Sequence, residues 1–274
     1  MNKIAVIGLG IIGGSICAAL TKAGYLVDGV DLSANTVEYA LKKGYIAKET
    51  KDISAYDVVF IATPPSATIS ILDTYHFKDG ALVCDICGVK KDIERVVYQK
   101  ERNYRYVGLH PMAGKETSGI ESASSELFVG ANLILVQAPQ TEKNAVDEAK
   151  FYAHAMRFGE IVECSAEEHD RKIALTSQLA HIVSNAYVKS PQVKGCDPFT
   201  GGSFQDMTRI AGVDEKMWTQ LYMHNREYLL QELETLIGNL EIYRETLAFE
   251  NEEGLSKILK DGRIIREQIK VKNR

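Results

Sequence analysis

The sequence predicts an α/β fold, in which a doubly wound, mostly parallel sheet is followed by an all-α C-terminal domain. Two observations carry this prediction. Short apolar runs alternate with helical patterns through residues 1–165, which is typical of chains that build parallel sheets. From Ala166 onward no further convincing strand follows, and apolar residues recur every three to four positions, as on helices. We therefore expect two domains, residues 1–165 and 166–274.

The first expected strand runs directly into a glycine-rich turn and then into a helix. Gly8 would allow a tight turn, Gly10 would let the backbone approach a pyrophosphate, and Gly13 would let the helix pack closely on the strand. The N-terminus of the helix that follows offers unpaired N–H groups and a partial positive charge to the phosphates, and Ile11 and Ile12 of the turn are expected to contact the cofactor. The pattern predicts a Rossmann-like domain that binds a dinucleotide.

The second expected strand ends in an acidic residue, Asp31, which follows Gly13 by 18 positions. A carboxylate at this place would hydrogen-bond the ribose hydroxyls of the adenosine and repel a 2′-phosphate. This favours NAD over NADP as the cofactor. The alternative is that Asp31 caps the helix that begins near Ser33.

The other elements of the first domain continue the alternation of strands and helices. We expect further strands at residues 26–31, 58–62, 81–85, 106–110, 132–136 and 159–164, and a short, weak strand within 45–55. Expected helices cover residues 16–23, 33–43, 65–72, 89–102 and 142–158. Parallel strands end at one edge of a sheet, where ligands bind. The residues expected at this edge are Asp31, Thr63 with Pro64, Asp85 and His110.

Residues 111–130 are rich in Gly, Ser, Thr and Glu, and they predict a long functional loop. In the second domain we expect helices at 168–189, 204–211 and 215–248. The last of these presents more apolar surface than a domain of this size easily covers, so we predict a homodimer built from the C-terminal helices. The alternative is a long helix packed entirely within its own domain.

The composition argues against several classes of protein. A formal net charge of −5 over 274 residues leaves no global basic footprint for nucleic acid. The apolar runs are too short to span a membrane, and we expect no signal peptide. The five cysteines are scattered, which indicates reduced thiols and a cytoplasmic protein. Cys84 and Cys87 have the spacing of a redox or metal pair, but no second Cys or His pair lies nearby, so we expect no metal site.

A nicotinamide enzyme needs a group that takes up a hydroxyl proton and a cation that holds substrate carboxylates. His110 ends a strand at the cofactor edge, where it suits acid–base work; the alternative is a histidine that caps a loop. His181 lies in a helix among apolar residues, a setting that by itself is more typical of a histidine satisfied at a helix interface. Arg209 lies in a short apolar helix, where a substrate carboxylate or Asp206 would pair with it.

Several longer motifs accompany these residues and follow one another across about residues 3–250. They are His110-Pro111-Met112-Ala113-Gly114 with Glu116 and Gly119, His169-Asp170-Arg171, Ser177-Gln178-Leu179-Ala180-His181, Gly201-Gly202-Ser203-Phe204 with Asp206, Thr208-Arg209-Ile210-Ala211, and Met217-Trp218. In type and order they resemble the signature of the prephenate dehydrogenase family, which includes prephenate, arogenate and cyclohexadienyl dehydrogenases. Together they are much more specific than the dinucleotide turn.

The resemblance implies NAD-dependent oxidative decarboxylation of prephenate to 4-hydroxyphenylpyruvate in tyrosine synthesis. It implies that His110 binds the ring hydroxyl and assists its deprotonation, that Arg209 holds a substrate carboxylate, and that His181 orients the substrate. Glu116 would gate or order the site. The remaining implied residues support the site or bind substrate: Asp170, Trp218 and Gly202.

Three positions depart from the family pattern. Gly88 stands where the family commonly has serine, so a hydroxyl near the substrate hydroxyl is missing and water or Cys87 would have to replace it. Lys115 stands where many members have Thr or Ser, and it adds a positive charge near the site. Gln178 replaces a frequent histidine, whereas His181 is kept.

Three alternative functions remain open. Arogenate carries an amine in place of the keto group of prephenate, and Lys115 weakly disfavours that extra positive charge. β-Hydroxyacid dehydrogenases and pyrroline-carboxylate reductases share the coarse plan, but they would use a lysine or a hydroxyl on the helical domain. A nucleotide-sensing module without turnover is a third alternative, because Gly88 removes a hydroxyl from the site.

Overall fold

The computed structural model describes residues 2–114 and 117–269. The chain divides into two compact units, one up to Arg226 and the other from Glu227. The first unit contains the whole sheet and also the helices that follow it as far as Arg226. The domain boundary expected at residue 165 stays a prediction.

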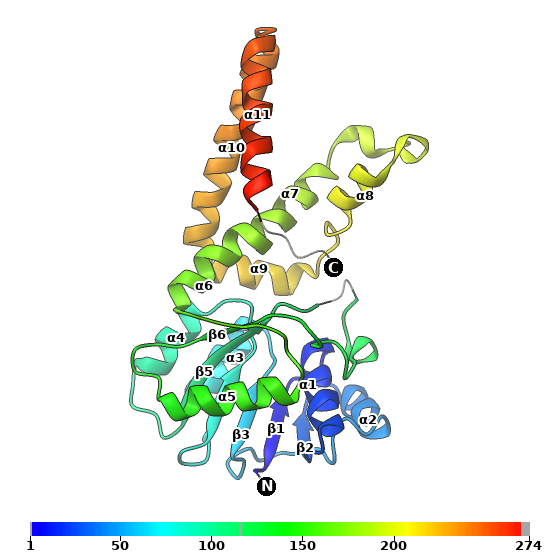
Figure 1. The fold of residues 1–274 in the computed structure, drawn as a ribbon. Coiled ribbons are helices and arrows are strands. Elements are labelled where there is room, and N and C mark those ends of the chain that lie inside the picture. The colour runs from blue at the N-terminus through cyan, green and yellow to red at the C-terminus, as the bar shows by residue number, and fades with distance from the viewer. Residues whose placement is uncertain (1, 115–116, 270–274) are drawn as a thin grey trace. The chain divides into compact units, whose positions relative to one another are not determined.

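The sheet has seven strands in the order β2-β1-β3-β4-β5-β6-β7 (Figure 1). Every neighbouring pair is parallel except β5 and β6, which confirms the mostly parallel α/β fold. All residues of β1, β3 and β4 are buried, as expected for parallel strands covered on both faces. The strands are β1 (Ile4–Ile7), β2 (Val27–Val30), β3 (Val58–Ile61), β4 (Leu82–Asp85), β5 (Arg105–Pro111), β6 (Leu133–Val136) and β7 (Ile161–Cys164).

Helices pack on both faces of the sheet and form two hydrophobic cores. One core contains side chains of α1, α2 and α5, and the other contains side chains of α3 and α4 (Figure 1). These helices are α1 (Ile11–Lys22), α2 (Ala34–Lys42), α3 (Pro65–Thr74), α4 (Lys91–Tyr98) and α5 (Lys143–Ala155). Pro65 begins α3, where its missing N–H costs nothing. The doubly wound arrangement leaves the carboxyl ends of the parallel strands free for a ligand.

The helix expected over residues 215–248 is the clearest error of the sequence analysis. It is broken at Asn225 into α9 (Glu215–His224) and α10 (Arg226–Ala248). Asn225 is buried, and its side-chain amide donates to the Asp170 carbonyl oxygen at 2.8 Å and to Gln178 Oε1 at 2.7 Å. These hydrogen bonds hold a non-helical residue in a sequence whose apolar periodicity continues on both sides.

Smaller differences concern two other segments. The helix expected over 168–189 consists of α6 (Ala166–Ile173), a π-helical stretch (Ala174–Leu179) and α7 (Ala180–Tyr187). The weak strand expected within 45–55 is reduced to one bridge between Gly29 and Glu49. The short helix α8 (Gly202–Thr208) lies within the range expected for it, apart from a start two residues earlier.

The second unit consists of α10 and α11 (Glu252–Gln268), which a turn at Glu250 separates. Within the residues described, α11 has no buried side chain. The two helices expose large apolar side chains: Ile237, Leu240, Ile242, Leu247, Leu259, Ile264 and Ile265. In the described part of the chain, no helix has both the length and the apolar character that crossing a bilayer requires.

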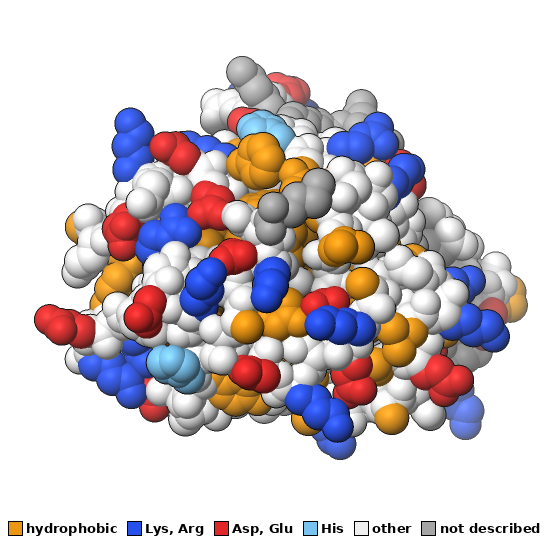
Figure 2. All heavy atoms as spheres, turned by 90° about the horizontal axis from the view of Figure 1, so that it is seen from below, with side chains coloured by type: hydrophobic (Ala, Val, Ile, Leu, Met, Phe, Trp, Pro, Cys, Tyr) orange, Lys and Arg blue, Asp and Glu red, His pale blue; other side chains and the backbone are white. Residues whose placement is uncertain are grey.

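The face that carries the amino ends of the strands shows a mixed distribution of charge. Figure 2 shows Lys and Arg side chains interspersed with Asp and Glu over this face. Neither sign of charge dominates the surface seen there.

A buried ion pair lies at the carboxyl end of β4. Lys90 Nζ donates to Asp85 Oδ1 at 2.5 Å, and both side chains are fully buried. Tyr106 donates its hydroxyl proton to Asp85 Oδ2 at 2.6 Å, and the Cys87 N–H donates to Asp85 Oδ1 at 2.9 Å. Burial, together with the Asp85 charge, raises the pKa of Tyr106 well above its usual value. Each charge is thus balanced or hydrogen-bonded, which a buried ion requires.

Replacing Lys90 with methionine should strongly destabilise the protein. Lys90→Met leaves the Asp85 carboxylate buried without its cation, and such losses cost about 3–5 kcal/mol. Lys22→Met removes the exposed pair with Glu126 and should leave the free energy of unfolding nearly unchanged. Urea unfolding of both variants checks this, and equal midpoints would show that the buried pair is not structurally important.

Candidate active site

Three glycines shape the turn between β1 and α1, each for a different reason. Gly8 has a φ of +87°, which favours glycine, and a Cβ there would lie 2.5 Å from a carbonyl oxygen of the segment after β3. A Cβ on Gly13 would lie 1.8 Å from the Gly8 carbonyl oxygen. A Cβ on Gly10 would meet no described atom within 4 Å. Gly10 therefore borders space that a ligand can occupy, next to the first-turn N–H groups of Ile11 and Ile12.

The Asp31 carboxylate lies at the end of β2 and accepts two backbone hydrogen bonds. Its Oδ2 accepts from the Leu9 N–H at 2.7 Å, and its Oδ1 accepts from the Ser33 N–H at 2.9 Å. Ser33 itself is the N-cap of α2. A carboxylate has further lone pairs, so it can also accept hydrogen bonds from ribose hydroxyls. The residue that caps α2 is thus Ser33 and not Asp31, and the remaining lone pairs of Asp31 face no competing helix cap.

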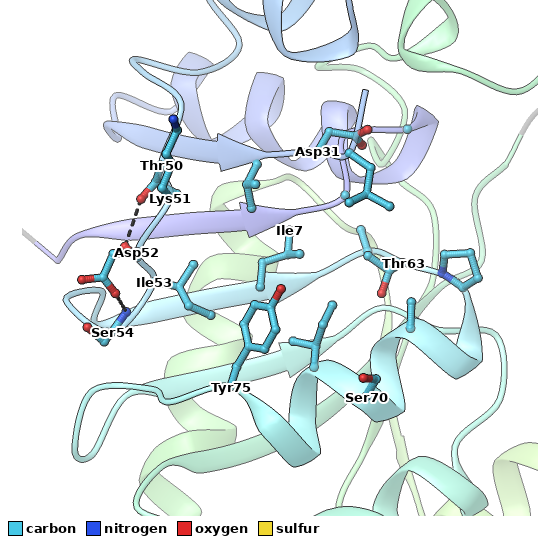
Figure 3. Close-up of a pocket in the computed structure, with 18 of the residues that line it drawn as sticks. Ile7, Asp31, Thr50, Lys51, Asp52, Ile53, Ser54, Thr63, Ser70 and Tyr75 are labelled. Carbon is cyan, nitrogen blue, oxygen red and sulfur yellow. Dashed lines mark hydrogen bonds between the residues drawn. The ribbon is translucent and has the colours of Figure 1, made fainter. Parts of the chain in front are cut away.

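A cavity of about 940 Å³ lies at the carboxyl ends of β1, β2 and β3. Asp31 follows β2 and Thr63 follows β3, and both line the cavity (Figure 3). Gly10 and Pro64 line it as well. The Thr63 hydroxyl is hydrogen-bonded to Thr68 at 2.8 Å. The volume falls in the range of sites for cofactors and other small molecules.

The rest of this cavity is formed by the segment after residue 49 and by α3. Tyr75 and Ser70 come from α3 and the residue that follows it, and Ile53 comes from the opposite segment (Figure 3). Asp52 orders that segment, because its carboxylate accepts from the Ser54 N–H at 2.9 Å and its carbonyl accepts from the Thr50 hydroxyl at 3.0 Å. The cavity thus joins apolar walls to a few fixed polar groups.

His110 lies near the end of β5 and is hydrogen-bonded to a second histidine. Its Nδ1 is 2.8 Å from His169 Nε2, and His169 Nδ1 is 2.7 Å from Asp170 Oδ1. His169 and Asp170 are buried in α6, whereas His110 is partly exposed. Burial lowers the pKa of His110 well below 6.5, and the neighbouring His169 and Lys90 lower it further. His110 is therefore a neutral imidazole near neutral pH.

Asp170 also fixes the start of α4. Its Oδ1 accepts from the Lys90 N–H and its Oδ2 from the Lys91 N–H, both at 2.9 Å. These N–H groups belong to the cap and the first turn of α4, where no helical carbonyl can reach them. A single buried carboxylate thus connects α4 with α6 and with the histidine pair.

A second cluster lies between α7, α8 and α9. His181 Nδ1 donates to the Ile210 carbonyl at 2.9 Å, and its ring lies 3.9 Å from that of Trp218, centroid to centroid. Burial lowers the pKa of His181, the hydrogen bond to Ile210 partly opposes this, and the charge of Arg209 lowers it further. Arg209, at the end of α8, is exposed. His181, Trp218 and Arg209 therefore form one group that combines a cation with aromatic surface.

Helix α9 connects the two clusters. Trp218 contacts the His181 ring, and Leu221, three residues later on the same side, lies 3.3 Å from where a Cβ on Gly88 would be. The same Cβ would be 3.7 Å from His110 Nε2. Helix α9 therefore lies beside His181 at Trp218 and near His110 at Leu221.

Comparison with known proteins identifies the family. A family model described as prephenate dehydrogenase, nucleotide-binding domain, matches residues 16–157, and one described as prephenate dehydrogenase, dimerization domain, matches residues 165–261. The chain belongs to the prephenate dehydrogenase family. It is therefore an oxidoreductase, as the motifs predicted.

Relatives of the prephenate dehydrogenase family match over nearly the whole chain. A prephenate dehydrogenase of Bacillus subtilis is 30% identical and is matched over 100% of this chain and 77% of its own length. A cyclohexadienyl dehydrogenase of Zymomonas mobilis is 29% identical over 98% of this chain and 96% of its own. The crystal structure of a prephenate dehydrogenase from A. aeolicus, in complex with hydroxyphenyl propionate and NAD⁺, has a TM-score of 0.86 and 28% identity, covering 98% and 99% of the two chains.

The other family positions have different surroundings. Gln178 is buried, donates to the Leu221 carbonyl at 3.2 Å and accepts from Asn225, so it holds α9 in place. Gly202 begins α8 and is exposed. Lys115 and Glu116 lie outside the described residues.

Sequence reasoning missed three residues of this site. It assigned no role to His169, although this residue is in a matching motif, and it passed over Lys90 and Asn225. Neighbouring residues on a helix do not usually face each other, so no local pattern indicates that His169 contacts Asp170. The signal that was available is a histidine beside an acid in a motif shared with a family of dehydrogenases.

Two alanine substitutions should separate the structural glycine from the ligand-facing one. Gly10→Ala should keep wild-type stability but weaken NADH binding about ten-fold or more, because its Cβ enters the space left for the pyrophosphate. Gly13→Ala should lower the free energy of unfolding by about 1–3 kcal/mol or more, because its Cβ overlaps the Gly8 carbonyl. Thermal unfolding and NADH fluorescence titration measure the two effects. Unchanged NADH affinity in Gly10→Ala would contradict the placement of the dinucleotide.

Proposed function

We propose that this chain catalyses the NAD-dependent oxidative decarboxylation of prephenate to 4-hydroxyphenylpyruvate, CO₂ and NADH. The observation that carries the proposal is His110, a neutral imidazole at the carboxyl edge of the sheet with its Nε2 next to the small Gly88. An alcohol oxidation requires a base at this place. The B. subtilis relative is a prephenate dehydrogenase, which supports the same substrate.

The residues of the first cavity fit NAD⁺. Gly10 leaves space for a pyrophosphate, Ile11 and Ile12 offer N–H groups, and Asp31 has lone pairs for ribose hydroxyls. Thr63 and Pro64 line the cavity at the end of β3. When bound, NAD⁺ supplies the hydride acceptor of the reaction. The A. aeolicus relative was crystallised with NAD⁺, which supports this cofactor.

His110 moves a proton twice in the proposed reaction. Nε2 accepts the proton of the ring hydroxyl while hydride leaves the carbinol carbon, which gives a ring ketone. The ring carboxylate then leaves as CO₂, and its bonding electrons complete the aromatic ring. The resulting phenolate oxygen takes the proton back from His110. The site therefore ends the cycle in its starting protonation state.

The second cluster holds the substrate. Arg209 pairs with a carboxylate of prephenate, for which a guanidinium is well suited. His181 is fixed by the Ile210 carbonyl and by Trp218, so it presents one ring orientation to the substrate. By the family resemblance, Gly202 belongs to the substrate site and Glu116 gates or orders it. Lys115, which departs from the family pattern, adds a positive charge near the site.

Two copies of the chain associate through their C-terminal helices. The match to a dimerization domain over residues 165–261 supports this arrangement. So do the large apolar side chains that α10 and α11 expose. Burying them against a second copy would remove this apolar surface from water.

Steady-state rates with prephenate and arogenate test the proposed function. We expect a higher kcat/KM with prephenate and NAD⁺ than with arogenate and NAD⁺. His110→Asn should lower kcat about 10²–10⁴-fold and leave NADH affinity unchanged, because it removes the base but not the cofactor site. His154→Asn, an exposed histidine on α5, serves as the matched control and should keep full activity. A preference for arogenate, or full activity of His110→Asn, would overturn the assignment.

The pH dependence should reflect the lowered pKa of His110. The base must be unprotonated to act, so activity is present above its pKa and is lost as pH falls through it. Because that pKa lies well below 6.5, kcat/KM should stay on its plateau as pH falls through 6.5 and decline only at more acidic pH. Initial rates over a pH series measure this, with circular dichroism as a check on folding. A decline that begins above pH 6.5 would contradict the proposed base.

A further inference from the structure

We propose that His169 is a positioning residue that holds His110 in the tautomer whose Nε2 is free to accept a proton, with Asp170 as its anchor. This inference rests on the proposed role of His110 as the base. The pairing of the two imidazoles carries it, since a series of three hydrogen-bonded groups, Asp170, His169 and His110, allows only one consistent placement of hydrogens.

The placement of hydrogens follows from Asp170. Its carboxylate accepts hydrogen bonds from the Lys90 and Lys91 N–H groups, so it acts as an acceptor on both oxygens. His169 Nδ1, at 2.7 Å from Asp170 Oδ1, must then carry a hydrogen and donate it. A neutral imidazole has one donor and one acceptor nitrogen, so His169 Nε2 is an acceptor.

The same reasoning continues to His110. Its Nδ1 faces the acceptor His169 Nε2 at 2.8 Å, so His110 Nδ1 carries the hydrogen. His110 Nε2 is left with a lone pair, which is the form that a general base needs. With Gly88 beside Nε2, no side chain at position 88 can hold that end of the ring. The orientation of His110 therefore depends on the hydrogen bond at Nδ1.

The charges around the pair favour two neutral rings before the reaction and a stabilised cation during it. Burial lowers the pKa of His169, although Asp170 partly opposes this. Lys90, from the cap of α4, disfavours further positive charge but is paired with Asp85 from β4. Glu94 of α4 lies near the carboxylates of Asp170 and Asp85. Burial raises the pKa of the Glu94 carboxyl, and these two charges raise it further. When His110 takes up a proton, its positive charge is stabilised by the Asp170 carboxylate, to which it is connected through the hydrogen bonds of His169.

A purely structural role would give a different result from a positioning role. If His169 only supports Asp170 at the start of α4, changing His169 should alter stability and leave kcat per folded molecule unchanged. If His169 sets the tautomer, kcat should fall while the KM for prephenate and the affinity for NADH stay within about two-fold. Loss of the correct tautomer in a comparable histidine relay costs up to about 10⁴-fold in rate.

Kinetics of three variants, made in the full-length chain, test the proposal. His169→Phe keeps a ring but removes the acceptor, and we expect kcat to fall about 10²–10⁴-fold. His169→Gln restores an acceptor for His110 Nδ1–H and should recover at least about ten-fold of that loss. Asp170→Asn places an amide against His169 Nδ1 and should also lower kcat. A kcat of His169→Phe within two-fold of wild type would overturn the proposal.

The tautomer itself can be read without any turnover. ¹⁵N-labelled histidine in the wild-type protein should show His110 and His169 both as neutral Nδ1–H rings near neutral pH, and His169→Gln should keep that form of His110. An Nε2–H ring for His110 in the wild-type protein would overturn the proposal, and this result does not depend on whether the variants fold. If wild-type protein shows the Nδ1–H form but turns over neither prephenate nor arogenate, the proposed function fails while the positioning role stands.

Discussion

The buried carboxylate of Asp170 is the constraint on which the candidate site depends. It accepts hydrogen bonds from two backbone N–H groups at the start of α4 and from His169 Nδ1 in α6. Hydrogen bonds to charged groups stabilise by about 1.5–3 kcal/mol each, and leaving such a group unpaired in the interior costs more. The three partners therefore have to remain together. As a result, the helical segment is held where His169 reaches the end of β5 and its His110.

Much of the fold could be predicted from the sequence, because its signals are local. The glycine turn, the fully apolar strands and the proline at the start of α3 each act within a few residues. The break at Asn225 could not be predicted, since it depends on hydrogen bonds to Asp170 and Gln178, about fifty residues away in the sequence. Apolar periodicity runs through the break, so it reports which side of each helix is buried and not where one helix ends.

The candidate site was predicted in part for the same reason. Gly10, Asp31 and His110 lie at strand ends, and their places follow from the parallel sheet. His169 and Lys90 are set by tertiary contacts between α6, α4 and β4, which no local pattern reports. Polar side chains buried far from their sequence neighbours are thus the part of a site that sequence patterns show least.

The hydrogen bond between Asp31 and the Leu9 N–H has a consequence for the kinetics of cofactor binding. It holds the glycine turn to the end of β2 within the protein itself, without the help of a ligand. A loop that is already in its binding conformation loses little conformational entropy when a ligand arrives. The nucleotide can then bind in one diffusional step rather than wait for a rare open state. Affinity at this end of the cavity is accordingly governed by how fast the dinucleotide leaves.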